Sequence, residues 1–207
     1  MRSLMFSLAV LTAGMPAVQA RDAEGNAAIK GSGQAKCEIF IQSLNDNKQE
    51  AVLFVGWLNG FMSGINLFEE KTFDIVPWQP PAYLVALMRN YCTQNPEEPF
   101  HSAALKLARS FAPTRLAERS DVVQVPHEEG QLPIYKAVLQ RVQEHLIEEG
   151  YLIGSADGLY GPATKRALEA YQQARGIEVT GIPDLNTLQS VLVVDPAREA
   201  QPQDQQD

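Results

Sequence analysis

The chain has 207 residues, of which 45% are hydrophobic and 20% are charged, and its formal net charge at pH 7 is −8. This length allows one ordinary domain or two small ones, and the composition is that of a globular protein, which excludes disorder along the whole chain. A chain this acidic is a poor partner for nucleic acid or for an anionic membrane surface.

Residues 1–20 have the pattern of a signal peptide. Arg2 precedes a short apolar run, and the small residues that end at Ala20 suit signal peptidase, which places cleavage after Ala20. The alternative is an uncleaved N-terminal anchor, although the apolar run is about half as long as a bilayer crossing requires. We therefore expect a periplasmic protein whose mature chain begins at Arg21 and, having lost Arg2, carries a net charge of −9.

The two cysteines, Cys37 and Cys92, are an even number in a chain expected to be exported. Such a count in an oxidising compartment favours one disulfide bond. A metal pair or a nucleophilic thiol would need His, Asp or further Cys residues at suitable spacing, and the sequence offers none.

After a flexible N-terminus over 21–33, the segment 34–112 is predicted to form four helices. In the first, Cys37, Phe40 and Leu44 recur at helical spacing on one face. The predicted helices begin near Cys37, Gln49, Ala82 and Phe100. We expect the disulfide bond to join the first helix to the end of the third.

The second of these helices contains eighteen uncharged residues, 51–68, with glycines at positions 56, 60 and 64. Length and composition would allow a membrane span. However, charged residues flank the stretch, and Asn59, Ser63 and Asn66 form a narrow polar arc, which favours a mostly buried soluble helix. A strip of glycines would let a neighbouring backbone pack closely. We expect no membrane span in the mature chain.

Residues 113–133 show no sustained period, contain three prolines and are predicted to be a linker. The segment 134–194 is predicted to form three short helices: Gly176 suits the end of the second, and Asp184 suits the N-cap of the third. Residues 195–207 are predicted to be a disordered acidic tail.

The N-terminal pattern is a cysteine on a first helix, "WLNGFMSGIN" on a second, and a second cysteine followed by "TQNP". Over roughly 34–112 it resembles the HdeA-like helical group, which includes acid-stress chaperones and the Rap/Tai-type immunity proteins of type VI secretion. The resemblance implies a disulfide-tied helical periplasmic domain. An immunity role would imply binding to a peptidoglycan-amidase toxin, and a chaperone role would imply exposure of apolar surface at low pH.

The segment from about 139 to 192 resembles the type 1 peptidoglycan-binding domain, a three-helix module. The residues that carry the resemblance are Leu139, Gln140, Leu146, Gly150, Tyr151, Asp157, Gly158, Leu159, Tyr160, Gly161, Pro162, Ala163, Thr164, Ala167, Leu168, Tyr171, Gln172, Gly176, Val179, Thr180, Gly181, Asp184 and Leu188. Peptidoglycan is the ligand that this resemblance implies.

A shallow groove beside the "DGLYGPAT" loop is the predicted ligand site. Exposed amides and aromatic rings there would suit stem peptide and sugar. The candidate contacts are Asp157, Gly158, Tyr160, Gly161, Thr164, Tyr171 and Gln172. Each has a structural alternative: the Asp, Gly and Thr residues would form the turn and the first helical turn, and either tyrosine would serve equally well in the core.

The sequence predicts no catalytic residue, no metal site and no cofactor. A zinc amidase or carboxypeptidase would need a cluster of His and carboxylate ligands, and the three histidines, His101, His127 and His145, do not form one in the sequence. Adjacent acids such as Glu69 and Glu70 are typical of solvated surface and not of a glycosidase pair.

The sequence thus predicts an all-α, exported, two-domain protein that is not an enzyme. We expect a periplasmic cell-wall-binding protein that anchors a small helical partner-binding domain to peptidoglycan, because tethering raises the effective concentration of the attached domain. The alternatives are an immunity or inhibitor protein against a peptidoglycan-cleaving toxin, and an HdeA-like acid-stress chaperone.

Overall fold

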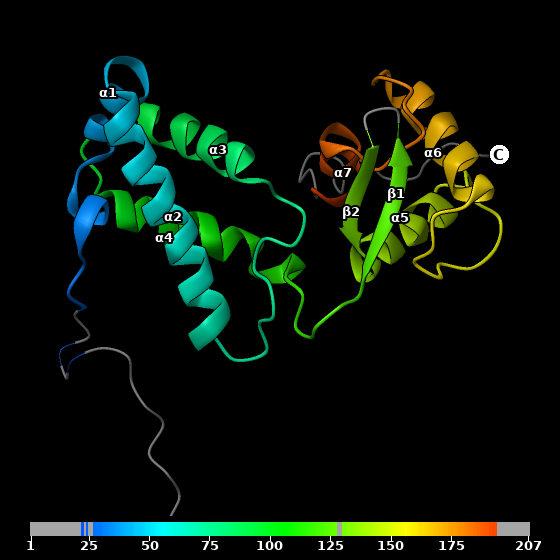
Figure 1. Cartoon of the computed structure of the whole chain (residues 1–207), viewed down its shortest axis with the longest axis horizontal. Helices are drawn as coiled ribbons and strands as arrows, with labels where there is room; N and C mark the ends of the chain where they lie inside the picture. Colours follow the sequence, from blue (N-terminus) through cyan, green and yellow to red (C-terminus); the bar gives the residue numbers. More distant parts are fainter. Residues whose placement is uncertain (1–21, 23, 25–26, 128–129, 194–207) are drawn as a thin grey trace, which may run out of the picture. The chain divides into compact units, whose positions relative to one another are not determined.

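The structure, a computed structural model, describes residues 22, 24, 27–127 and 130–193. The predicted signal peptide and acidic tail lie outside these residues. Figure 1 shows the elements, which are mostly helical as predicted. In chain order they are η1 (Gly31–Gln34), α1 (Cys37–Asp46), α2 (Lys48–Phe68), α3 (Pro81–Gln94), α4 (Phe100–Phe111), η2 (Ala112–Thr114), β1 (Val122–His127), β2 (Gly130–Tyr135), α5 (Lys136–Glu148), α6 (Pro162–Arg175) and α7 (Leu185–Leu192).

The N-terminal region, residues 31–116, has its own hydrophobic core among α1 to α4. The predicted disulfide bond between Cys37 and Cys92 is present and joins the start of α1 to α3. Beside it, the rings of Phe40, Phe54 and Phe100 meet pairwise, with centroids 4.9 to 5.4 Å apart. These ring contacts connect α1, α2 and α4, and the disulfide bond ties α3 to the same core.

The stretch just before α1 is more ordered than the sequence suggested. Residues 21–33 were expected to be flexible, but Gly31–Gln34 form the 3-10 helix η1. Gly33 is buried, and its carbonyl lies 3.0 Å from Nδ1 of His101. Gly31 lies against Trp57. The prediction missed this turn because its stability comes from contacts with α2 and α4, which are distant in sequence.

Helix α2 contacts α1, α3 and α4, but the expectation that it is mostly buried is wrong. Only 17% of its most apolar 18-residue window is buried. An added Cβ atom at Gly56, Gly60 or Gly64 would have no neighbour within 4 Å, so the glycine strip does not pack against another backbone. In the described part of the chain, α2 is the one helix long and apolar enough to cross a membrane.

Strands β1 and β2, most of whose residues fall in the predicted linker, pair as the two strands of a β-hairpin. Val123 pairs with Ile134 and Val125 pairs with Leu132, so these four side chains share one face and contribute to the C-terminal core. The prolines that suggested a linker, Pro126 and Pro133, lie on the other face. Each strand of a two-stranded sheet has a free edge, where proline removes no required hydrogen bond.

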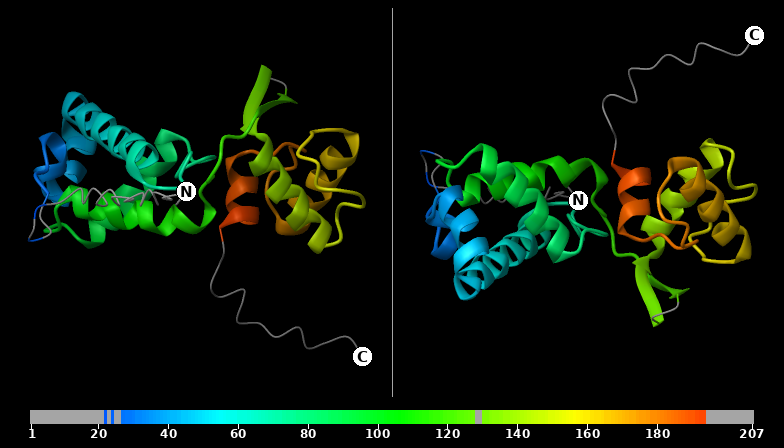
Figure 2. Two further views of the ribbon diagram at one scale, coloured as in Figure 1. Left: turned by 90° about the horizontal axis from the view of Figure 1, so that it is seen from below. Right: turned by 90° about the horizontal axis from the view of Figure 1, so that it is seen from above.

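The C-terminal region, residues 122–193, places α5, α6 and α7 around a second hydrophobic core. Both views in Figure 2 show the hairpin projecting on one side of these helices. The predicted helix ends are confirmed: Gly176 has φ +66° at the C-cap of α6, and Oδ1 of Asp184 accepts a hydrogen bond from N–H of Thr187 at the start of α7. Ile134, assigned to the first helix of this segment by its spacing, belongs to β2 instead.

Candidate binding groove of the C-terminal region

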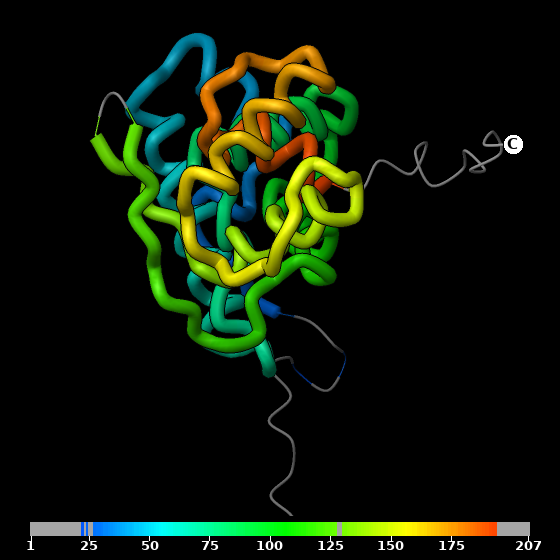
Figure 3. The backbone as a smooth tube through the Cα atoms, turned by 90° about the vertical axis from the view of Figure 1, so that its right-hand side faces the viewer, coloured from blue at the N-terminus to red at the C-terminus, as the bar shows by residue number. Residues whose placement is uncertain are grey.

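A buried glutamine on α5 organises the loop that leads to α6. Gln143 is 2% exposed, and its Oε1 accepts a 2.7 Å hydrogen bond from N–H of Gly158. Its Nε2 lies 3.0 Å from the carbonyl of Leu159, 3.1 Å from Oγ1 of Thr164 and 3.1 Å from Oδ1 of Asp157. Residues 150–161, which contain no helix or strand (Figure 3), are thus held to α5 mainly by Gln143, and Nε2 of Gln140 adds a 3.3 Å hydrogen bond to the carbonyl of Ala156.

A second buried glutamine, on α6, organises the loop that leads to α7 in the same way. Gln172 is 0% exposed, and its Oε1 accepts hydrogen bonds from N–H of Thr180 at 3.0 Å and N–H of Gly181 at 2.8 Å. Its two Nε2 hydrogens are shared among three acceptors, Oγ1 of Thr180, the carbonyl of Ile182 and Oγ1 of Thr187, which lie at 3.0, 2.9 and 2.8 Å. Both amide ends of Gln172 are therefore used inside the protein.

These two networks form an internal structural repeat over residues 157–164 and 180–187. In each segment the second residue is a glycine with positive φ, +70° for Gly158 and +69° for Gly181. Each segment ends in a buried threonine, Thr164 or Thr187, on the first turn of the next helix. Sequence reasoning missed Gln143, although the repeated glycine-to-threonine spacing was the signal that could have revealed it.

Four of the predicted ligand contacts are buried and form the framework of the site instead of its surface. Tyr171 is 0% exposed, and its hydroxyl lies 2.8 Å from Oγ of Ser190. Gln172, Thr164 and Gly158 belong to the two networks described above. The structural alternative holds for Tyr171, Thr164 and Gly158, and Gln172 is likewise structural, because their polar groups are already paired within the chain.

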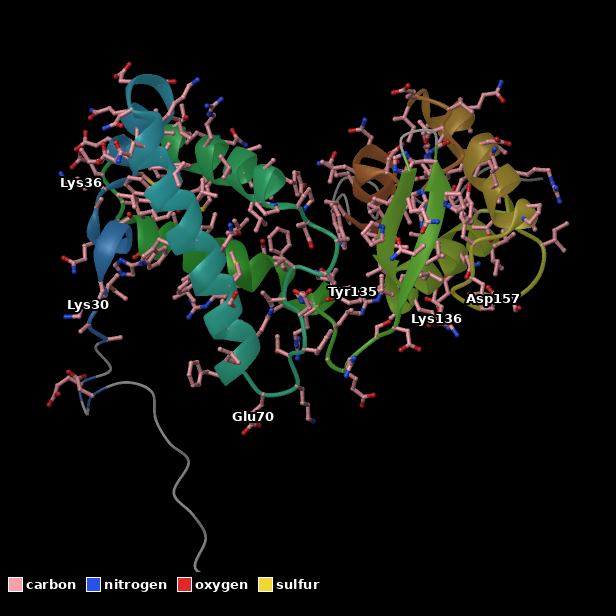
Figure 4. The ribbon with its side chains drawn as sticks, in the orientation of Figure 1. Lys30, Lys36, Glu70, Tyr135, Lys136 and Asp157 are labelled. Carbon is pink, nitrogen blue, oxygen red and sulfur yellow. A yellow bond between two sulfur atoms is a disulfide. The ribbon has the colours of Figure 1, made fainter. Side chains whose placement is uncertain are left out.

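Asp157 and Gly161 lie on the loop without lining the groove described next. Asp157 is exposed, and the backbone N–H of Leu159, followed by the Gln143 amide, holds the pKa of its carboxyl below the usual value. Figure 4 shows Asp157 near Lys136, at the start of α5. Gly161, the N-cap of α6, has an extended backbone with φ −141° that any residue adopts.

Tyr160 is the predicted contact that does line a groove. Its hydroxyl donates a 2.7 Å hydrogen bond to the carbonyl of Gly181, which fixes the ring between the two loops. The groove has a volume of about 640 Å³. It is lined by Pro126, His127, Tyr160, Lys165, Glu178, Val179, Thr180 and Ile182. Sequence reasoning did not select the hairpin, Lys165 or Glu178 as parts of this site.

Residues 137–191 match the family described as "Putative peptidoglycan binding domain". The match covers about a quarter of the chain and includes both glutamine networks, and the C-terminal resemblance seen in the sequence is thereby confirmed. No curated protein and no solved structure shows a significant match to the chain. The hairpin residues of the groove, Pro126 and His127, lie outside the matched segment.

The matched domain has groups suited to binding, and its described part shows no metal centre. Within the described residues of the chain, no three or more His, Cys, Asp or Glu side chains are grouped so that they could hold a metal ion. The groove instead offers a cation at Lys165, an anion at Glu178, one tyrosine ring and several apolar side chains. This set of groups suits noncovalent recognition of a polar ligand.

Proposed function

We propose that the C-terminal domain binds peptidoglycan and holds the rest of the protein at the cell wall without catalysing a reaction. The match of residues 137–191 to a peptidoglycan-binding family carries this proposal. The two complete glutamine networks support it, because they keep both loops of the domain in a defined conformation beside an open groove. A site preorganised in this way loses little conformational entropy when it binds.

The proposal includes export to the periplasm, with cleavage after Ala20. The disulfide bond between Cys37 and Cys92 supports an oxidising compartment, because such bonds persist in secreted and periplasmic proteins and are rare in the cytosol. N-terminal sequencing of the protein recovered from a periplasmic extract tests this part. A first residue of Arg21 is expected, and a retained Met1 would contradict it.

Sedimentation with insoluble peptidoglycan tests the proposed binding. The mature chain should pellet with the wall material, whereas a control chain that ends at Arg119 should stay in solution because it lacks the hairpin and α5 to α7. Thiol titration of the control checks that its disulfide bond has formed. Recovery of the mature chain in the supernatant, at wall concentrations that pellet a known wall-binding domain, would refute the proposal.

A second candidate function is partner binding by the N-terminal region, and the outer surface of α2 favours it. Val52, Leu53, Leu67 and Phe68 are 63 to 86% exposed, and no charged residue lies between Ala51 and Phe68. An exposed apolar surface of this kind marks an interaction site. We propose that this surface binds a protein at the cell wall. In an inhibitor role, the bound protein would be an enzyme that cleaves peptidoglycan.

The test compares the mature chain with the double variant Leu53→Glu, Leu67→Glu. If the surface binds a wall-cleaving amidase, the mature chain inhibits that enzyme at a one-to-one ratio, and the variant does not. Protection of an unfolding client at low pH would point to the chaperone alternative instead. Flotation of the mature chain with lipid vesicles, lost in the variant, would show that α2 contacts membrane and would contradict partner binding.

A further inference from the structure

We infer that the groove recognises the stem peptide of peptidoglycan, through a free carboxylate and a free amine, and not the glycan strand. This inference rests on the proposed function and specifies which part of the wall polymer is bound. It depends on three features of the groove: its pair of opposite charges, its anchored tyrosine ring, and the wall that the hairpin contributes.

The cation of the groove is available to a ligand. The side chain of Lys165 is 54% exposed and forms an ion pair with Glu169 on the next turn of α6, at 3.8 Å. Exposed pairs of this kind contribute little energy, because water and salt screen them. A ligand carboxylate that enters the groove can therefore take Lys165 as its partner at small cost, and a charge-assisted hydrogen bond would result.

The anion of the groove is also available. Glu178 is exposed, and within the described part of the chain its carboxylate takes part in no hydrogen bond or salt bridge. It follows α6 on the loop that Gln172 holds, so its backbone position is fixed by a buried network. A carboxylate and a cation that line the same groove suit a ligand that carries both an amine and a carboxylate. Stem peptides carry both groups, whereas the N-acetylated sugars of the glycan strand have no amine.

The remaining surface favours a peptide over a sugar. Protein sites hold sugars by stacking aromatic faces on the C–H surface and by directing polar groups at the hydroxyls. Besides the small imidazole of His127, the groove has one aromatic ring, that of Tyr160, whose hydroxyl already donates to Gly181. The neighbouring surface is aliphatic, from Val179, which is 54% exposed, and from Ile182. Methyl groups such as those of alanine side chains pack well on this kind of surface.

The hairpin supplies one wall of the groove with Pro126 and His127. Its inner face is anchored in the core through Val125, which is 0% exposed, and Ile134, which is 6% exposed. The volume of about 640 Å³ lies within the range of small-ligand sites. The hairpin precedes the segment that matches the family, so this wall lies outside the matched residues 137–191.

Binding to three materials tests the inference with the mature full-length chain. The first is intact peptidoglycan, the second is glycan from which an amidase has removed the peptides, and the third is a soluble tetrapeptide stem with free amine and carboxyl groups. We expect the chain to pellet with intact peptidoglycan, to stay in solution with stripped glycan, and to bind the soluble peptide by calorimetry.

Two charge variants with matched controls complete the test. Lys165→Ala and Glu178→Gln should each weaken binding of the soluble peptide by about tenfold, the size expected for loss of one charge-assisted hydrogen bond. Arg166→Ala and Glu148→Gln, exposed positions outside the groove, should bind as the unchanged chain does. Unaltered circular dichroism in all four variants shows that the fold is kept.

The two possible failures are distinguishable. If the chain pellets equally with intact and stripped material, and the groove variants bind like their controls, the stem-peptide inference is overturned while wall binding stands. If the chain binds neither intact peptidoglycan nor the peptide, both the inference and the proposed function are overturned.

Discussion

Replacement of Gly158 by alanine should destabilise the C-terminal region strongly, and the structure provides a matched control. Gly158 has φ +70°, and a Cβ atom there would lie 2.5 Å from Cγ of Lys136, 2.7 Å from the carbonyl oxygen of Lys136 and 2.8 Å from Cγ of Gln140. Gly176 has nearly the same φ, +66°, but an added Cβ atom would have no neighbour within 4 Å. Comparison of the two alanine variants therefore separates the cost of the left-handed backbone from the cost of the steric clash at Gly158.

The expected magnitudes follow from these distances. Left-handed backbone costs a non-glycine residue about 1–2 kcal/mol, and this cost applies to both variants. Gly158→Ala adds an overpacking cost of about 1–3 kcal/mol. The backbone carbonyl of Lys136 begins α5 and cannot move aside like a flexible side chain. We therefore expect Gly158→Ala to lower the free energy of unfolding by about 1–3 kcal/mol more than Gly176→Ala does.

Urea unfolding of the mature chain, followed by methyl NMR signals of Leu168 and Val142 in the C-terminal core, measures this difference. The same signals report both variants, so the comparison does not depend on the N-terminal region. Equal losses of stability in the two variants would refute the reasoning, because they would mean that the loop moves away from α5 at no cost.

Three further predictions concern stability. Gln172→Ala should lower the free energy of unfolding of the C-terminal region by about 2–5 kcal/mol, because it leaves the buried N–H of Gly181 and the part-buried N–H of Thr180 without an acceptor. The exposed neighbour variant Gln173→Ala should change it by less than about 0.5 kcal/mol in the same NMR-detected urea titration. Reduction of the Cys37–Cys92 bond, which closes a separation of 55 residues, should cost the N-terminal region about 4 kcal/mol, measured by urea unfolding with tryptophan fluorescence; an unchanged midpoint would contradict a structural role. Hydrogen bonds from Lys106, and then from Tyr91, hold the pKa of Glu98 below its usual value of 4.5, so this carboxylate stabilises the fold above pH 4.5 and the effect is lost as pH falls through the lowered pKa. Glu98→Gln should therefore be less stable than the unchanged chain at pH 7, with a gap that closes in acid, and a gap independent of pH would exclude this carboxylate as the cause.

The local rules of helix formation made much of the fold predictable. Helix α4 spans Phe100–Phe111, as its apolar spacing indicated, and the ends of α6 and α7 fall at Gly176 and Asp184. These features depend on residues within a few positions of each other, so a single sequence contains the information. The disulfide bond was predictable because the chain has two cysteines.

The groove needed the tertiary structure. Tyr160 lines it and Tyr171 is buried, yet both are tyrosines in the same matched domain, and only the packing of α6 against α5 and α7 distinguishes them. The strands of the hairpin contain prolines that argue against a sheet, and their pairing is stabilised by burying Val125 and Ile134 on distant helices. On α2 the periodicity identified an apolar helix. How much of its surface is buried depends on how α1, α3 and α4 pack against it. Burial depends on contacts between segments that are distant in the sequence. The sequence therefore determined the helices, their ends and the disulfide bond. The tertiary structure decided which side chains remain exposed to a ligand.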